Sequence, residues 1–202
     1  MDNDTLRRGK PTSHVVFGEA QAILAGDGLL TEAFVCLSSV PDPATAAACV
    51  RCLAQAAGSA GMVGGQVMDM EKPPDAGAEW LREMERRKTG CLIRAAVETG
   101  MICAGADGDM IRRGREYGTH LGAAFQAVDD ILDVTGDEKN MGKSLGKDRE
   151  ENKFTAVTIF GLDGAVAMAR RETALAVEAL SGLGPEADFL RRTAEMMLQR
   201  VN

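Results

Sequence analysis

Aromatic residues and prolines are scarce in this sequence of 202 residues. Aromatic side chains make up 4% of the chain and six residues are proline, whereas 45% are hydrophobic, with many Ala, Leu and Met. Sandwiches and barrels need more β-branched and aromatic residues, so the composition excludes a mainly β fold and favours helices. The length suffices for one sizeable core but not for several. We predict an all-α protein with a single domain over residues 1–202.

An excess of positive charge is also lacking. The chain holds 23 Lys and Arg against 30 Asp and Glu, which gives a net charge of -7. Proteins that bind nucleic acids need a basic surface to neutralise the phosphate backbone. We therefore expect no nucleic-acid partner.

Signals for membrane insertion and secretion are missing from the sequence as well. No apolar run approaches the roughly 20 residues that cross a bilayer, and the charged N-terminus is not followed by the apolar core of a signal peptide. The five cysteines lie in apolar helical patterns, which is typical of reduced, buried thiols. The pair Cys49 and Cys52 has no histidine near it in the sequence, so a zinc site is not favoured. We expect a cytoplasmic protein without a membrane span.

Apolar residues recur at helical spacing along most of the chain. Asp42 is expected to cap a helix that has Pro43 in its first turn. The glycines of that helix, which include Gly58 and Gly65, fit a close backbone approach to another helix or space for a ligand. A Gly/Lys/Asp-rich loop is expected at 136–152. The pattern predicts helices over approximately 14–37, 44–70, 78–103, 107–134, 154–160, 163–180 and 186–201.

Three aspartates and a glutamine share one face of the helix expected to end near residue 134. At about 100° per residue from Gln126, Asp129 lies at about -60°, Asp130 at about +40° and Asp133 at about -20°. Carboxylates at this spacing repel one another, and they supply the oxygen ligands that Mg²⁺ prefers beside a phosphorylated substrate. We predict a magnesium site on this face. An acidic, solvated helix face is the alternative.

Complementary positive charge lies in three other places. Lys143 stands in the loop after the aspartates, Arg7 and Arg8 stand near the N-terminus, and Lys88 is followed by Thr89. Flexible basic side chains and backbone N–H groups near helix ends bind phosphate oxygens. Each cluster alone is more typical of a solvated basic patch. Together with the aspartates, they predict a pocket for magnesium diphosphate.

These motifs, in this order, resemble those of a known family. Residues 7–12 read R-R-G-K-P-T, 64–69 read G-G-Q-V-M-D, 88–90 read K-T-G, 125–133 read F-Q-A-V-D-D-I-L-D, and 142–148 read G-K-S-L-G-K-D. The combination resembles the bacterial short-chain polyprenyl diphosphate synthases, of which the farnesyl and geranylgeranyl diphosphate synthases are the nearest members. The resemblance covers essentially the whole chain.

The resemblance implies an isoprenoid synthase helical bundle, found in this family as a homodimer. It also implies a Mg²⁺-dependent prenyl transfer. In that reaction an allylic diphosphate with a dimethylallyl, geranyl or farnesyl group loses its diphosphate. Isopentenyl diphosphate attacks the resulting carbocation, and a proton leaves to the released diphosphate. Such catalysis needs positioning and electrostatic stabilisation rather than a protein nucleophile.

The same resemblance implies roles for individual residues. The expected magnesium ligands are Asp129, Asp130 and Asp133, which match the family's second aspartate-rich motif. Arg8 matches a position on the isopentenyl diphosphate side. The residues that match positions on the allylic diphosphate side, with roles in catalysis and substrate binding, are Arg7, Lys88, Thr89, Gln126 and Lys143.

The family's first aspartate-rich motif precedes the R-R-G stretch, and this chain begins inside it. Asp2 matches the last aspartate of that motif and is the fourth expected metal ligand. The resemblance thus implies a family fold that is truncated at its N-terminus. We expect this chain alone to be a poor or inactive prenyltransferase.

Three functions are compatible with these observations. The first is a prenyltransferase that elongates prenyl chains. The second is a non-catalytic subunit or degenerate paralogue that pairs with a full-length synthase. The third is a terpene cyclase of the same fold. The clustered carboxylates favour the transferase, because a protein freed from catalysis has no physical reason to keep them. Gln66 and Asp69 share a helix face and are expected either to approach the substrate or to form a buried polar pair.

Overall fold

The computed structural model describes residues 3–7, 9–135 and 154–201, and these confirm the predicted all-α class. A hairpin of two short strands, β1 (Leu6–Arg7) and β2 (Lys10–Pro11), adds no sheet layer. The helical elements, in chain order, are α1 (Ser13–Phe17), α2 (Glu19–Ser38), α3 (Pro43–Ala57), α4 (Met62–Met70), α5 (Ala78–Glu85), the π-helical turn η1 (Arg86–Gly90), α6 (Cys91–Cys103), α7 (Gly108–Thr135), α10 (Ala156–Ala179), the 3-10 turn η2 (Pro185–Ala187) and α11 (Asp188–Gln199).

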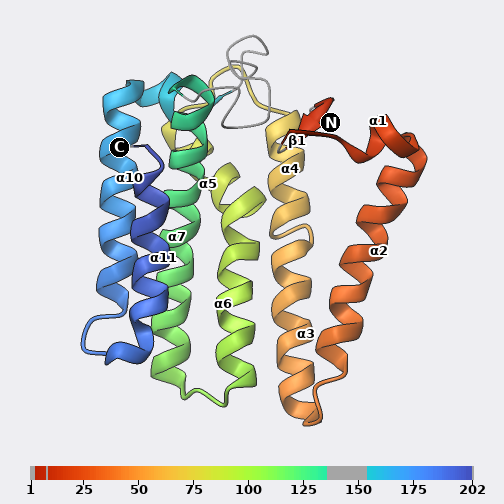
Figure 1. Ribbon diagram of the computed structural model, residues 1–202, viewed down its shortest axis with the longest axis vertical. Helices are drawn as coiled ribbons and strands as arrows, with labels where there is room; N and C mark the ends of the chain where they lie inside the picture. Colours follow the sequence, from red (N-terminus) through yellow and green to blue (C-terminus); the bar gives the residue numbers. More distant parts are fainter. Residues whose placement is uncertain (1–2, 8, 136–153, 202) are drawn as a thin grey trace.

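The long helices stand side by side with nearly parallel or antiparallel axes (Figure 1). α7 occupies a central position, because it packs against α6, α10 and α11, and α6 in turn packs against α3. The end of α7, the start of α10, the end of α4 and the N-terminal hairpin all lie at the upper end of the bundle in Figure 1. This end therefore gathers the segments that carry most of the predicted site residues.

Two apolar clusters join α7 to its neighbours. Small residues predominate on α10, which lets the two helix backbones approach closely. The cluster nearer the upper end consists of Ala127, Val128, Ile131, Leu132, Ala156, Ala165 and Ala169. The lower cluster consists of Tyr117, Leu121, Ala176, Leu180 and Ala194. The fully buried Tyr117 donates its hydroxyl hydrogen to the carbonyl oxygen of Leu190 at 2.8 Å, so its one polar group is satisfied.

Glycines set helix boundaries that differ from the predicted ones. Gly18, with φ of 87°, separates α1 from α2 inside the helix expected over 14–37. The stretch from Gly58 to Gly61 separates α3 from α4 inside the helix expected over 44–70. Gly161, with φ of 73°, has non-helical backbone and kinks α10 at the break expected between 154–160 and 163–180. Positive φ values suit glycine because it has no Cβ. The apolar spacing continues across the first two breaks and hides them in the sequence.

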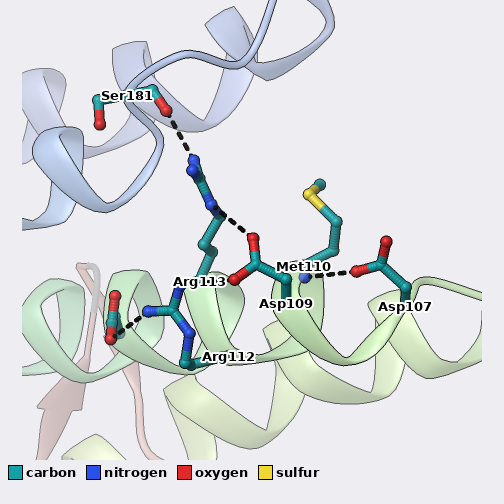
Figure 2. Close-up of polar contacts among 7 residues, drawn as sticks. Asp107, Asp109, Met110, Arg112, Arg113 and Ser181 are labelled. Atoms are coloured by element: carbon teal, nitrogen blue, oxygen red, sulfur yellow. Dashed lines mark hydrogen bonds and ion pairs between the residues drawn. The ribbon is translucent and has the colours of Figure 1, made fainter.

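Polar contacts define the lower end of the bundle (Figure 2). The Asp107 carboxylate accepts the Met110 backbone N–H at 2.9 Å and caps the start of α7. Arg113 donates to Asp109 at 3.2 Å and to the Ser181 carbonyl oxygen at 2.6 Å, which ties α7 to the segment after α10. The cap expected at α3 is confirmed in the same way, because Asp42 accepts the Thr45 N–H at 2.8 Å.

α2 is the least buried of the long helices in the described ranges. None of its residues is buried, and Leu29 is 74% exposed, Ile23 65% and Leu24 65%. By length and composition, Glu19–Ser38 and Pro43–Met70 are each apolar enough to cross a membrane, contrary to the expectation from the sequence. The second stretch contains the break between α3 and α4 and packs against α6. Core helices of globular proteins pass the same test, so this property does not establish a membrane span.

Candidate active site

Lys88 and Thr89 lie on the π-helical turn η1 between α5 and α6. A π-helical turn inserts extra backbone into an otherwise continuous helix and is frequent at functional sites. Two glycine contacts hold this turn. The Gly122 position on α7 lies so close to Gly90 that a Cβ there would be 2.8 Å from the Gly90 Cα, and a Cβ on Gly65 of α4 would collide with the Lys88 backbone. η1 is therefore held between α4 and α7. The contact of Gly65 with η1 is a close backbone approach of the kind predicted for the glycines of 44–70.

Lys88 reaches from η1 to α4. Its Nζ forms an ion pair with Asp69 Oδ2 at 2.7 Å, and the two side chains are 33% and 26% exposed. Of the two interpretations that the sequence left open for Asp69, the structure favours a polar pair satisfied by a neighbouring element. The pair is partly exposed rather than buried, so a negatively charged ligand could reach Lys88.

Thr89 and Asp130 are linked through Gln126. The Thr89 hydroxyl donates to Gln126 Oε1 at 3.0 Å, and Gln126 Nε2 donates to Asp130 Oδ1 at 2.8 Å. Asp130 Oδ2 accepts the backbone N–H of Ala156 at 2.7 Å. Three elements, η1, α7 and α10, are thereby connected through side chains that the sequence singled out.

The three aspartates of α7 differ in exposure. Asp129 is half-buried, whereas Asp130 is 4% exposed and Asp133 is 5% exposed. The shared face predicted from the spacing is thus not a solvated acidic face. Burial of charged carboxylates is unfavourable unless partners or cations compensate for it, so this placement disfavours the alternative that the sequence left open.

A further carboxyl group, Glu85, lies beside this cluster and was not predicted as a site residue. It is 8% exposed on α5. Burial raises the pKa of Glu85 to about 8, the negative charge of Asp130 adds to this, and Arg82 opposes it. Glu85 is therefore mostly protonated at neutral pH, while Asp130 accepts two hydrogen bonds. The signal in the sequence that could have found Glu85 is its position one helical turn after Leu81, which puts it on the buried face of α5.

Arg7 occupies a separate position. It lies on the exposed hairpin, opposite Lys10 in the strand register. The hairpin lies at the same end of the bundle as the cluster (Figure 1). Three predicted site residues, Asp2, Arg8 and Lys143, lie outside the described residues.

The donor set on α7 fits magnesium in its chemistry. Among the described residues, no group of three His, Cys, Asp or Glu side chains is arranged to hold a metal ion. Mg²⁺ commonly binds through one or two carboxylates together with waters and substrate phosphates, rather than in a cage made by protein alone. The half-buried carboxylate of Asp129, at the end of the bundle that also holds Lys88, meets that requirement.

A cavity of about 190 Å³ lies next to Glu85, on another side of α7 from Asp129. Its lining includes Glu85, Arg94, Ala123 and Glu172. On α7, Ala123 points about 120° away from Asp129, at about 100° per residue. The cavity is therefore distinct from the place where Asp129 would meet a ligand.

Comparisons with known proteins agree with this geometry. A family model described as polyprenyl synthetase matches residues 1–181. The farnesyl diphosphate synthase of Geobacillus stearothermophilus is 47% identical over 172 residues, which cover 82% of this chain and 57% of that protein. The farnesyl diphosphate synthase of Bacillus subtilis is 42% identical over 205 residues, which cover 99% of this chain and 69% of that protein.

A solved structure agrees with the fold. The crystal structure of a geranyltransferase from Helicobacter pylori, complexed with magnesium and isoprenyl diphosphate, superposes with a TM-score of 0.85 at 30% identity. The match covers 98% of this chain and 66% of that chain. This chain belongs to the polyprenyl synthetase family and has the helical fold of its solved relatives. It spans between roughly half and two thirds of the length of these relatives.

Proposed function

We propose that this protein is a polyprenyl diphosphate synthase, a prenyltransferase that joins an allylic prenyl group to isopentenyl diphosphate and releases diphosphate. The observation that carries the proposal is that Thr89, next to Lys88 on η1, is linked through Gln126 to Asp130 of the aspartate motif, in a member of this family. The alternative of a non-catalytic subunit is not favoured, because the relatives reported above are synthases and this cluster is retained.

In the proposed reaction, the chain's own residues bind and orient an anion. Lys88 exchanges its ion pair with Asp69 for the oxygens of the allylic diphosphate, which carry more negative charge than one carboxylate. Arg7, Arg8 and Lys143 are proposed to bind the diphosphates of the two substrates, with Arg8 on the isopentenyl side. Positive groups at the leaving diphosphate stabilise the charge that develops as the carbon–oxygen bond breaks.

Magnesium is proposed as the cofactor. The residues proposed to hold it are Asp129 and Asp133, with Asp2 from the N-terminal motif; Asp130, which the motif also includes, is treated separately below. Bound together with diphosphate, the metal supplies positive charge to the leaving group. The magnesium and isoprenyl diphosphate in the Helicobacter pylori relative support this assignment.

Pairing with a second copy of the chain is part of the proposal. The exposed apolar side chains of α2, among them Ile23, Leu24 and Leu29, each exposed by more than 60%, are the support for it within this structure. Exposed apolar patches of this kind mark surfaces that associate with protein. A homodimer in the cytoplasm is consistent with such a surface.

Calorimetry and turnover test the proposed function. The chain is titrated with inorganic diphosphate at fixed Mg²⁺, and again after the metal is removed with EDTA. We expect binding only when the metal is present. In a second assay, isopentenyl and geranyl diphosphates are supplied with Mg²⁺, and any product is expected to be a longer prenyl diphosphate. Equal diphosphate binding with and without metal would contradict the proposal.

A further inference from the structure

Asp130 is more deeply buried than the adjacent Asp129 and is held at both oxygens of its carboxylate. Both oxygens of Asp130 accept hydrogen bonds from the protein, Oδ1 from Gln126 Nε2 and Oδ2 from the Ala156 N–H. Consecutive residues of a helix point about 100° apart, so the two neighbouring carboxylates face different surroundings. Asp129 is half-buried, and Asp130 is nearly fully buried.

The contact with Ala156 attaches α10 to α7. Ala156 is the first residue of α10, and the first N–H groups of a helix have no partner within it. A carboxylate at this position satisfies one of these groups and interacts favourably with the helix dipole. Thr155 caps the same helix end, because its hydroxyl accepts the Thr158 N–H. Asp130 adds what that local cap cannot, a link to another helix.

The contact with Gln126 sets the orientation of the Gln126 amide. An ionised carboxylate only accepts hydrogen bonds, so the NH₂ end of Gln126 must face Asp130. The oxygen end then faces η1, where it accepts the Thr89 hydroxyl at 3.0 Å. If the amide were turned round, its NH₂ group would face Thr89 and its oxygen would meet the Asp130 carboxylate.

We infer that Asp130 is a positioning residue rather than a direct magnesium ligand: it holds the oxygen of Gln126 toward Thr89 and fixes the start of α10 to α7. Ligation of a metal by Asp130 would compete with two hydrogen bonds of 2.7 and 2.8 Å at a nearly buried side chain. The inference rests on the proposed function insofar as Gln126 and Thr89 bind substrate. Asp129 keeps the role of metal ligand.

Matched substitutions at adjacent positions separate the two roles. Asp129→Asn and Asp130→Asn remove the same charge and keep the same shape. In calorimetry with Mg²⁺ and inorganic diphosphate, Asp129→Asn is expected to weaken binding about 10-fold or more. Asp130→Asn is expected to weaken binding less than about 3-fold and to lower Tm by about 3–6 °C, since its single amide oxygen can keep only one of the two hydrogen bonds, and that one becomes neutral.

A reciprocal exchange tests the orientation of the amide. In Asp130→Asn, the new NH₂ group faces the NH₂ group of Gln126 unless Gln126 turns. In the double variant Gln126→Glu with Asp130→Asn, the carboxylate at position 126 accepts from Thr89 and from the new amide at position 130, while the oxygen of that amide still accepts from Ala156. We expect this exchange to restore at least half of the Tm lost in Asp130→Asn. No recovery would contradict the inferred contacts.

A stability-matched control separates positioning from general loosening of α10. Thr155→Val removes the local cap of the same helix end and leaves Gln126 untouched. Wherever turnover of isopentenyl and geranyl diphosphates is measurable, Asp130→Asn is expected to lower kcat about 10-fold with unchanged dependence on Mg²⁺, and Thr155→Val is expected to leave kcat unchanged. Equal loss of kcat in both variants would reduce Asp130 to a structural role and overturn the inference.

Asp130 would be shown to be a metal ligand if Asp130→Asn weakened the magnesium-dependent binding as much as Asp129→Asn while Tm stayed the same. If the proposed function is wrong, the result is different, because the unsubstituted chain would then bind no magnesium diphosphate in calorimetry. In that case the Tm values of Asp130→Asn and of the reciprocal exchange would still decide whether the inferred contacts exist.

Discussion

Two kinds of polar contact meet around η1. The ion pair between Lys88 and Asp69 is partly exposed, and such pairs are worth about 0–1 kcal/mol. It can therefore be exchanged for a more highly charged partner at little cost. The bonds of Asp130 are buried, and breaking buried charge-assisted bonds costs about 1.5–3 kcal/mol each. The site thus combines a lysine that can exchange its partner with buried hydrogen bonds that stay in place.

Replacement of Lys88 tests the exchangeable part of the site. Lys88→Met keeps most of the side-chain length and removes the ammonium group. Loss of a charge-assisted contact of about 1.5–3 kcal/mol is expected to weaken diphosphate binding about 10- to 100-fold in calorimetry with Mg²⁺. The control is Lys72→Met, whose ammonium lies over the Phe154 ring. A similar loss of diphosphate affinity in both variants would mean that binding depends only on the net charge of the protein.

The buried carboxylate of Glu98 provides a test by pH. The hydrogen bond from Arg115 holds the pKa of Glu98 below its ordinary value of 4.5, although burial opposes this. Because the pKa is lowered on folding, the stabilisation is present above 4.5 and is lost as the pH falls through the folded value.

Glu98→Gln is therefore expected to lower the free energy of unfolding by about 1–3 kcal/mol at about pH 7, and by less at about pH 3. Urea unfolding at the two pH values measures this. Glu116→Gln is the matched control, since the pair of Glu116 with Arg112 is about half exposed on both sides. Its effect is expected to stay within about 0.5 kcal/mol. A pH-independent loss for Glu98→Gln would contradict the assignment.

At the scale of elements, the site depends on how closely three helices approach. The contact of Gly122 with Gly90 places Gln126 within reach of Thr89, one turn along α7. Helical periodicity could predict which residues of α7 share a face. The π-helical turn could not be predicted, because residues 85–90 contain no apolar side chain whose spacing would reveal the extra backbone.

Alanine substitutions at two helical glycines test this close approach. Gly122→Ala puts a methyl group 2.8 Å from the Gly90 Cα, so we expect a loss of about 1–3 kcal/mol in the free energy of unfolding. Gly100→Ala in α6 meets no atom within 4 Å, and it is expected to gain up to about 1 kcal/mol from helix propensity. Chemical denaturation of both variants measures the change in the free energy of unfolding, which is expected to be a loss for Gly122→Ala and a gain for Gly100→Ala. A stabilised Gly122→Ala would show that the helices are not in backbone contact.

For the molecule as a whole, burial is unevenly distributed. α7 contributes the largest share of the buried residues, whereas α2 has none. A helix with so many apolar residues would be expected to cover them against a neighbour. The exposed apolar residues of α2 accordingly mark the helix through which association of the whole molecule is proposed.

A charge on α2 tests that association. Leu29 is 74% exposed, and Leu29→Asp places a carboxylate in the proposed interface. We expect the unsubstituted chain to have the mass of a dimer in light scattering coupled to gel filtration, and Leu29→Asp to shift it to the monomer. Phe189→Asp on α11 is the control, because Phe189 is equally exposed at 76% but lies elsewhere. A monomeric unsubstituted chain, or equal effects of the two variants, would contradict pairing through α2.

The sequence by itself determined the helical class, the cap at Asp42, and the residues of α7 that could serve a magnesium diphosphate site, because these follow from composition and from the fixed turn of a helix. Only the tertiary structure decided which partner each side chain has. The motif presents Asp129 and Asp130 as equivalent, yet Asp130 accepts from Gln126 and from an amide 26 residues further along the chain. Likewise, the pairing of Lys88 with Asp69 joins elements that are distant in sequence and are brought together by a close glycine contact, and the charge of Asp130 reaches Glu85 from another helix. Local periodicity carries no information about such contacts, since they depend on the approach of whole elements.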